Sequence, residues 1–118
     1  MRRLSWRNER VLYLRACDLC KKQTLSAISA DKPYTVYCRA CWWSDQWDPM
    51  SYGMDFDFSK PFFSQFDALL KRVPTIALQM KSNLENSEYC NEVEDIKDSY
   101  MAVCSFFGER LLYTYWLG

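Results

Sequence analysis

The sequence contains 118 residues, and its 15 basic and 15 acidic side chains give a formal net charge of zero. Hydrophobic residues make up 49% of the chain and aromatic residues 17%, which excludes a disordered protein and predicts one folded unit. Apolar runs of only a few residues exclude a membrane-spanning helix, and no apolar segment follows the first charges, so we expect a cytoplasmic protein that is not secreted.

The first segment, residues 1–15, is predicted to be a basic N-terminal arm. Residues 1–22 carry seven Arg or Lys against two acids, whereas residues 23–118 carry eight against thirteen. Arginines that alternate with aromatic residues suit phosphate contact and base stacking, although a basic run is also typical of a solvated segment. The candidate nucleic-acid-binding residues are Arg2, Arg3, Trp6, Arg7, Arg10, Arg15, Lys21 and Lys22.

Two Cys-x2-Cys pairs form the clearest motif of the chain. They consist of Cys17, Cys20, Cys38 and Cys41. This spacing lets two tight turns present four thiolates to one tetrahedral ion, which predicts a structural zinc site without an open coordination position. A redox dithiol and a rubredoxin-like iron site are the alternatives. The first lacks a surrounding βαβ pattern, and Lys21 and Trp42 stand where iron sites commonly carry Gly.

Residues 16–50 are predicted to form the zinc module. A turn signal, Asp-Lys-Pro at 31–33, precedes a β-prone run at 34–37, so we expect a hairpin that links the two cysteine pairs. Residues 42–47 show helical spacing before Pro49. This order resembles a treble clef more than a zinc ribbon. We expect Trp42, Trp43 and Trp47 to form the core of the module and not a platform for bases.

Residues 51–118 are predicted to be a helix and a short-strand repeat region packed on the module. Asp55 and Asp57 alternate with apolar residues, which favours a short extended segment with a solvated face over a cation site or an acid and base pair. Ser59 is the expected N-cap of an amphipathic helix of about four turns that ends at Pro74. We expect this helix to be buried against the domain.

Residues 75–78 are strand-like, and a repeat with a twelve-residue interval follows. Its segments begin at Asn86, Asp98 and Arg110, which predicts the start of a β-solenoid or, alternatively, a β-meander. The last repeat would leave an open edge, so we expect either a longer protein or a contact with another subunit. Cys90 and Cys104 are predicted to be buried thiols without a disulfide. The expected fold class is therefore α+β.

Five stretches of the sequence together resemble one protein family. They are RRLSWRNERVLY, CDLC, DKPYTVYCRACWWSDQWDP, YGMDFDFSKPFFSQF and ENSEYCNE. The resemblance covers residues 2–115 and is to an uncharacterised family of hypothetical zinc-knuckle proteins of candidate-phylum bacteria. It implies a zinc-knuckle head followed by a longer array of Asn/Cys/Tyr-rich repeats, and it implies no particular activity.

The residue content argues against catalysis. The chain has no histidine, no Gly-rich phosphate loop and no nucleophile motif. We therefore expect a non-catalytic zinc-binding structural or protein-interaction module that binds a protein partner or itself, with no membrane and no small-molecule substrate. The alternative is an RNA- or ribosome-binding protein that uses the basic arm, by analogy with treble clefs of ribosomal proteins.

Overall fold

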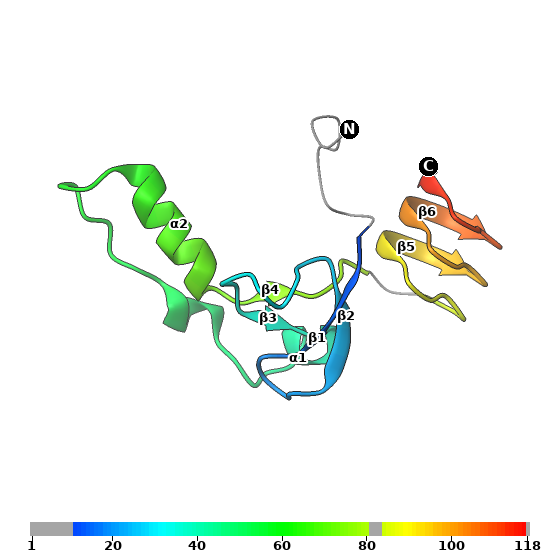
Figure 1. Cartoon of the computed structure of the whole chain (residues 1–118), viewed down its shortest axis with the longest axis horizontal. Coiled ribbons are helices and arrows are strands. Elements are labelled where there is room, and N and C mark those ends of the chain that lie inside the picture. The colour runs from blue at the N-terminus through cyan, green and yellow to red at the C-terminus, as the bar shows by residue number, and fades with distance from the viewer. Residues whose placement is uncertain (1–10, 81–83, 118) are drawn as a thin grey trace.

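The computed structural model describes residues 11–80 and 84–117. Over this part of the chain the structure is α+β with few, short helices and short strands, as predicted (Figure 1). Its elements are β1 (Tyr13–Ala16), β2 (Gln23–Ser26), β3 (Val36–Tyr37), α1 (Arg39–Trp42), the 3₁₀ turn η2 (Pro49–Tyr52), α2 (Phe62–Arg72), β4 (Thr75–Ile76), β5 (Asn91–Lys97), β6 (Val103–Glu109) and β7 (Tyr115–Leu117). None of the helices in the described ranges has the length and apolar character to cross a membrane.

Strands β1 and β2 form an antiparallel hairpin whose connection carries the first cysteine pair. Ala16 pairs with Gln23 at the end of the hairpin next to this pair. The predicted hairpin between the two cysteine pairs is wrong, because β3 pairs in parallel with β4, Val36 with Thr75. The turn at 31–33 does form, but the strand after it, β3, pairs with β4, which follows α2 in the chain, and it does not pair with β2.

The second cysteine pair begins a helix of a single turn. Helix α1 ends at Trp42 with Trp43 as its C-cap, so the helical segment predicted over 42–47 starts earlier and is shorter. In η2 the Asp48 carboxylate accepts a hydrogen bond of 2.9 Å from the Met50 amide, which fixes the start of the 3₁₀ turn. Residues 53–57 then connect η2 to the turn before α2 without a strand.

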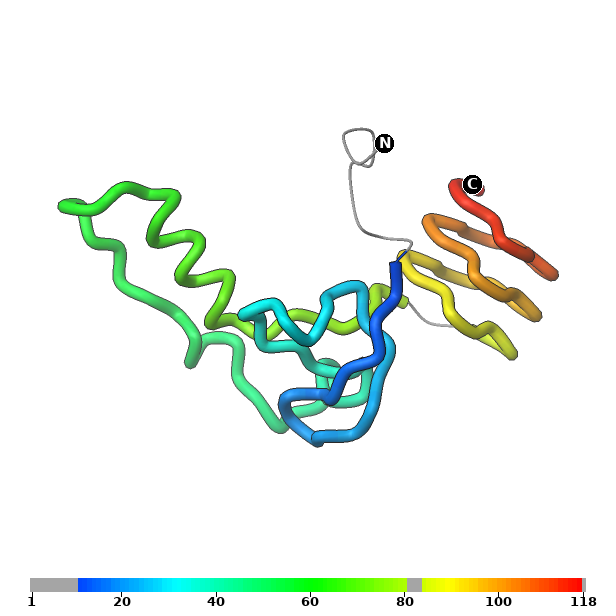
Figure 2. Tube along the Cα trace, viewed as in Figure 1, coloured from blue at the N-terminus to red at the C-terminus, as the bar shows by residue number. Residues whose placement is uncertain are grey.

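Helix α2 extends away from the hairpin and the sheets (Figures 1 and 2). It ends at Arg72, before Pro74 as predicted, but it begins after Pro61 without a side-chain cap. The Ser59 hydroxyl instead donates to the Asp57 carboxylate at 2.6 Å. No residue of α2 is buried, so the expected burial of this helix against the domain is wrong.

Strands β5, β6 and β7 form a parallel sheet with a register of twelve residues. Asn91 pairs with Val103, and Val103 pairs with Tyr115. Isolated parallel bridges with the same offset join Glu85 to Lys97 and Glu88 to Tyr100. The predicted interval of twelve residues is therefore present as the pairing distance, and the parallel pairing is incompatible with a meander, whose strands are antiparallel.

A three-residue pattern underlies this register. Every third residue from Leu84 to Thr114 is buried or half-buried, and the core contains Cys90, Val93, Ile96 and Ala102. Every third residue from 86 to 116 has a positive φ between 47° and 62°. These are Asn86, Tyr89, Glu92, Asp95, Asp98, Met101, Cys104, Phe107, Arg110, Tyr113 and Trp116. A left-handed residue in each triplet turns the chain so that the next third residue again faces inward.

Serines at inward-facing third positions form hydrogen bonds with the neighbouring turn. The Ser87 hydroxyl accepts the Ser99 amide at 3.2 Å, and the Ser99 hydroxyl accepts the Leu111 amide at 3.1 Å. A buried hydroxyl is tolerated when it has such a partner. These hydrogen bonds span twelve residues and therefore reinforce the register of the sheet.

The left-handed positions predict a large contrast between two neighbouring phenylalanines. Phe107 has φ 55°, whereas Phe106 is an ordinary strand residue opposite Glu94. A β-branched residue is strained at positive φ, so Phe107→Val should lower the free energy of unfolding by about 1–2 kcal/mol more than Phe106→Val. Urea denaturation of the two variants measures the difference, and equal effects would contradict the backbone assignment.

Candidate metal centre

The four predicted ligands come together at one point. The sulfur atoms of Cys17, Cys20, Cys38 and Cys41 all lie within 4.8 Å of one another. Cys20 Sγ and Cys38 Sγ are 3.8 Å apart, and a tetrahedral ion with metal–sulfur bonds of ~2.3 Å separates its sulfurs by ~3.8 Å. No pair of these cysteines forms a disulfide. The arrangement can therefore hold one metal ion with four thiolates.

Backbone turns place each pair of ligands. At the first pair the Cys17 amide donates to Lys22 O and the Lys21 amide donates to Cys17 O, both at 2.9 Å. Lys21 has φ 62°, so the tight turn is made without Gly. The sequence argument that used the missing Gly against a rubredoxin-like turn is therefore wrong at this position. At the second pair, Cys38 is the N-cap of α1, and Cys41 lies one turn later.

Hydrogen bonds and burial give the thiols unequal acidity. Burial disfavours the Cys17 thiolate, but backbone amides of Cys38, Cys20 and Leu19 outweigh burial and lower its pKa to about 6. Burial and the neighbouring cysteines raise the pKa of Cys41 to about 12. Deprotonation of the first thiol at this site is therefore favourable, and deprotonation of a further thiol beside it is unfavourable. A divalent cation would offset this repulsion and stabilise the fully deprotonated set.

An ion pair between the buried Arg15 and the half-exposed Asp18 supports the first cysteine turn from the outside. Arg15 is only 7% exposed, and its guanidinium donates to Asp18 Oδ2 at 3.0 Å and to the carbonyls of Ser29 and Tyr34 at 3.3 Å. Asp18 Oδ2 also accepts the Val36 amide at 2.6 Å. The pair therefore ties the first cysteine turn to β3, two residues before Cys38.

Removal of the Asp18 carboxylate should destabilise the module even when metal is bound. In Asp18→Ala the Arg15 guanidinium stays buried without its anion, and the loss should be about 2 kcal/mol, less than for a fully buried pair because Asp18 is 38% exposed to water. Asp31→Ala, which removes an exposed carboxylate beside Lys32, should have a much smaller effect. Unfolding of both variants in guanidinium chloride, with metal present, measures the difference. If both variants lose a similar small amount of unfolding free energy, the ion pair is dispensable.

Three of the predicted nucleic-acid-binding residues lie in the part of the chain that the structure describes. The guanidinium of Arg15 is buried and bound to Asp18. Lys21 and Lys22 are exposed, and Lys21 Nζ donates to the Asp18 carbonyl at 2.6 Å. The remaining candidates lie outside the described residues: Arg2, Arg3, Trp6, Arg7 and Arg10. Asp55 and Asp57 belong to no metal-competent group among the residues that the structure describes.

Aromatic side chains pack beside the cysteines. Trp47 lies 4.8 Å from Trp42 and 5.5 Å from Tyr37 between ring centroids, and its indole N–H donates to the Trp42 carbonyl at 3.0 Å. Trp42, Trp47 and Tyr37 thus join the core cluster of Cys17 and Cys41, as predicted. Trp43 is 71% exposed, so the prediction that all three tryptophans belong to the core is wrong for this residue.

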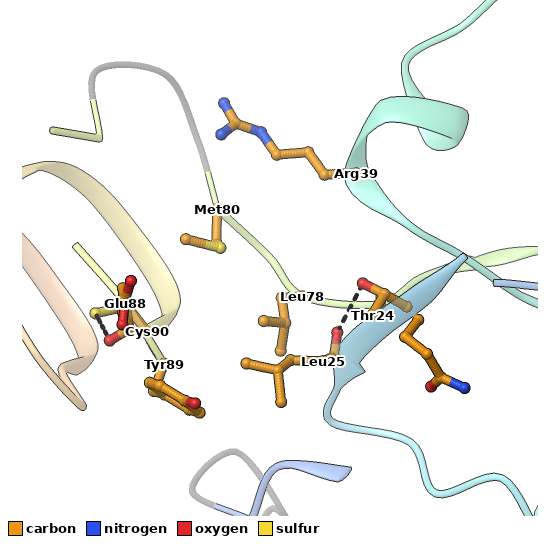
Figure 3. A pocket seen from close by; sticks show the side chains of 10 residues that line it. Thr24, Leu25, Arg39, Leu78, Met80, Glu88, Tyr89 and Cys90 are labelled. Carbon is orange, nitrogen blue, oxygen red and sulfur yellow. Dashed lines mark hydrogen bonds between the residues drawn. The ribbon is translucent and has the colours of Figure 1, made fainter. Parts of the chain in front are cut away.

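A groove of about 460 Å³ lies between the half of the structure that holds the four-cysteine cluster and the repeats (Figure 3). Leu25 and Leu78 line one wall, Tyr89 and Cys90 belong to the opposite wall, and Arg39 projects from α1 at one end. Burial raises the pKa of Cys90, and its thiol donates to the Glu88 carbonyl at 3.2 Å. A thiol with a raised pKa is a weak nucleophile at neutral pH, so Cys90 has the character of a packing residue.

Sequence reasoning missed the Arg15–Asp18 pair. The local signal for this pair is an Arg and an Asp three residues apart at the first cysteine turn, and in the sequence the Arg reads as one more member of the basic N-terminal run.

No known protein family, curated protein or solved structure matches this chain.

Proposed function

We propose that the chain is a zinc-binding module with a structural and protein-interaction role and without a catalytic centre. The observation that carries the proposal is the cluster of four sulfur atoms within 4.8 Å of one another. Four thiolates fill a tetrahedral zinc ion completely, so no position is left for water or substrate. An ion bound in this way stabilises the fold and leaves recognition to the surface of the protein.

The position of the ligands supports a treble-clef-like module more than a zinc ribbon. In our proposal the first pair occupies the turn of the β1–β2 hairpin, and the second pair occupies the start of α1. A ribbon would place the second pair in another hairpin turn. Backbone amides that point at sulfur, such as Cys38 N–H on Cys17 Sγ at 3.2 Å, are the outer contacts that structural zinc sites use.

The repeats support a second, finer proposal about the fold. We propose that residues 84–117 form the beginning of a β-solenoid with twelve residues per turn. Its support is the constant offset of all pairings from Glu85 to Leu117, together with the left-handed residue in every triplet. A stack of this kind extends by adding turns to its end, which suits a protein that presents a long surface to partners.

Metal content is the direct test of the proposed function. Full-length protein, purified without added metal, should contain close to one zinc per chain by elemental analysis. Replacement of the zinc by cobalt should give the absorption of a tetrahedral thiolate complex. Less than about half an equivalent of zinc, or an equivalent of iron in its place, would reject the assignment of the ion.

A further inference from the structure

Helix α2 and the segment before it carry a continuous aromatic surface, which we call the aromatic face. It consists of Phe56, Phe58, Phe62, Phe63 and Phe66. Phe62 lies 6.5 Å from Phe56, 5.4 Å from Phe63 and 5.7 Å from Phe66 between ring centroids. Phe58 joins the group through Phe56, at 4.8 Å. All five rings are exposed, Phe58 to 92% and Phe63 to 80%.

The backbone under the aromatic face is held in place. Gln65 on α2 accepts the Asp57 amide through Oε1 at 2.8 Å and donates through Nε2 to the Asp57 carbonyl at 3.0 Å. Asp57 also accepts the amide and the hydroxyl of Ser59, at 2.9 and 2.6 Å. These contacts fix the segment before the helix against α2. The surface is therefore pre-organised and would lose little conformational freedom on binding.

The size of the aromatic face lies at the upper end of what a monomer normally exposes. The exposed parts of the five rings add up to about three whole side chains, or ~600 Å² at about 200 Å² per ring. The largest apolar patch of a typical monomer is about 300–600 Å², and each partner of a standard interface contributes about 800 Å². The five rings alone therefore supply about three quarters of what one partner of a standard interface contributes, and neighbouring side chains would have to supply the rest.

The charges around the aromatic face indicate what covers it. Residues 53–72 carry three acids and three bases, so this segment has no net charge. Lys60 pairs with Asp57 at 2.9 Å, and Lys71 pairs with Asp67. Helices that lie on anionic membranes are rich in Lys and Arg on the polar face, which this segment is not. A segment without net charge also lets two identical surfaces approach without net repulsion.

We propose that the aromatic face binds the same face of a second copy of this chain and forms a symmetric dimer. A two-fold axis brings identical patches together, so each copy supplies the apolar surface that the other needs. The two α2 helices cross at the axis, and Phe58 and Phe63 pack at its centre. The proposal names the partner of the interaction module proposed above, but it does not depend on the identity of the metal.

Light scattering and sedimentation of full-length protein with two matched variants test the dimer. Phe63→Asp removes one exposed ring from the aromatic face, and Phe107→Asp removes a similarly exposed ring, 77% exposed, from the repeats. Wild type and Phe107→Asp should be dimers at micromolar concentration. Phe63→Asp should be a monomer, with dimer affinity reduced at least a hundredfold. Far-UV circular dichroism and zinc content per chain should be the same for all three.

The outcomes separate this inference from the proposed function. A monomeric wild type, or a dimer that Phe63→Asp does not weaken, would overturn the inference even if zinc is present at one equivalent. A monomer that binds neutral lipid vesicles through the aromatic face would overturn it in favour of a membrane. A dimer that contains no zinc but dissociates in Phe63→Asp would support the inference while the metal assignment fails.

Discussion

Replacing Cys41 by Ser should unfold the part of the chain around the metal, residues 13–47, and leave the repeats folded. Structural zinc contributes on the order of 10 kcal/mol to the apparent stability of small zinc domains, far more than any other contact described above. Without the ion, the buried part of this cluster consists of Cys17, Tyr37 and the serine at position 41, with a few half-buried side chains around them. A core of this size does not hold two short strands and a one-turn helix together.

Amide hydrogen exchange measured by mass spectrometry locates the effect. Peptides from β1, β2 and β3 should lose protection in Cys41→Ser, whereas peptides from β5 and β6 should keep it. Cys104→Ser is the matched control, since Cys104 is buried but its thiol bonds to Glu92 and belongs to no metal cluster of the described residues. Retained protection and retained metal in Cys41→Ser would show that the fourth ligand is dispensable.

Replacing Ile96 by Ala should destabilise the repeats by about 2–5 kcal/mol. Ile96 is 1% exposed and packs with Cys90, Val93 and Ala102 in a cluster that, among the described residues, Met80, Leu84 and Leu111 extend. With so few apolar residues, the cluster cannot collapse far into the space that the side chain leaves. The part of the lost unfolding free energy that comes from the empty cavity should therefore be close to its maximum.

Denaturation by urea, followed by circular dichroism of zinc-loaded protein, measures this loss. Lys97→Ala is a suitable control at the next position, because it removes only an exposed ion pair with Glu85 and should have a much smaller effect. If Ile96→Ala and Lys97→Ala have the same midpoint, the cluster around Ile96 is not the core of the repeats.

Local chemistry explains which features were predictable from the sequence. The four cysteines were identified because ligand spacing within each pair is a property of a few consecutive residues. The end of α2 was predicted because Pro74 restricts the residue before it. Both signals act over a few positions and do not depend on the rest of the chain.

Features that depend on distant partners were not predictable in the same way. Residues 34–37 have the composition of a strand, but nothing in that run indicates that the partner of Val36 is Thr75 and not a residue of β2. The aromatic spacing of α2 specifies an apolar side of the helix, and the sequence does not say what lies against it. Burial was therefore predicted where the structure shows exposure.

The repeat region lies between these cases. Its interval of twelve residues was visible in the sequence, but the three-residue pattern was missed because Ser87, Ser99 and Ser105 occupy inward positions that an apolar pattern would not include. Non-Gly residues at positive φ also carry no reliable sequence signal. Gly108, the one glycine in residues 84–117, is not among the left-handed residues.

The triplet pattern also restricts how this chain can change in length. Inserting or deleting a single residue within residues 84–117 would exchange inward and outward side chains in everything that follows, much as a one-residue slip does in an ordinary strand. An insertion of twelve residues would restore every pairing, from Asn91 with Val103 onward. Evolutionary gain and loss of sequence here should therefore occur in whole multiples of twelve, and frame-preserving duplication is the simplest route to such variants.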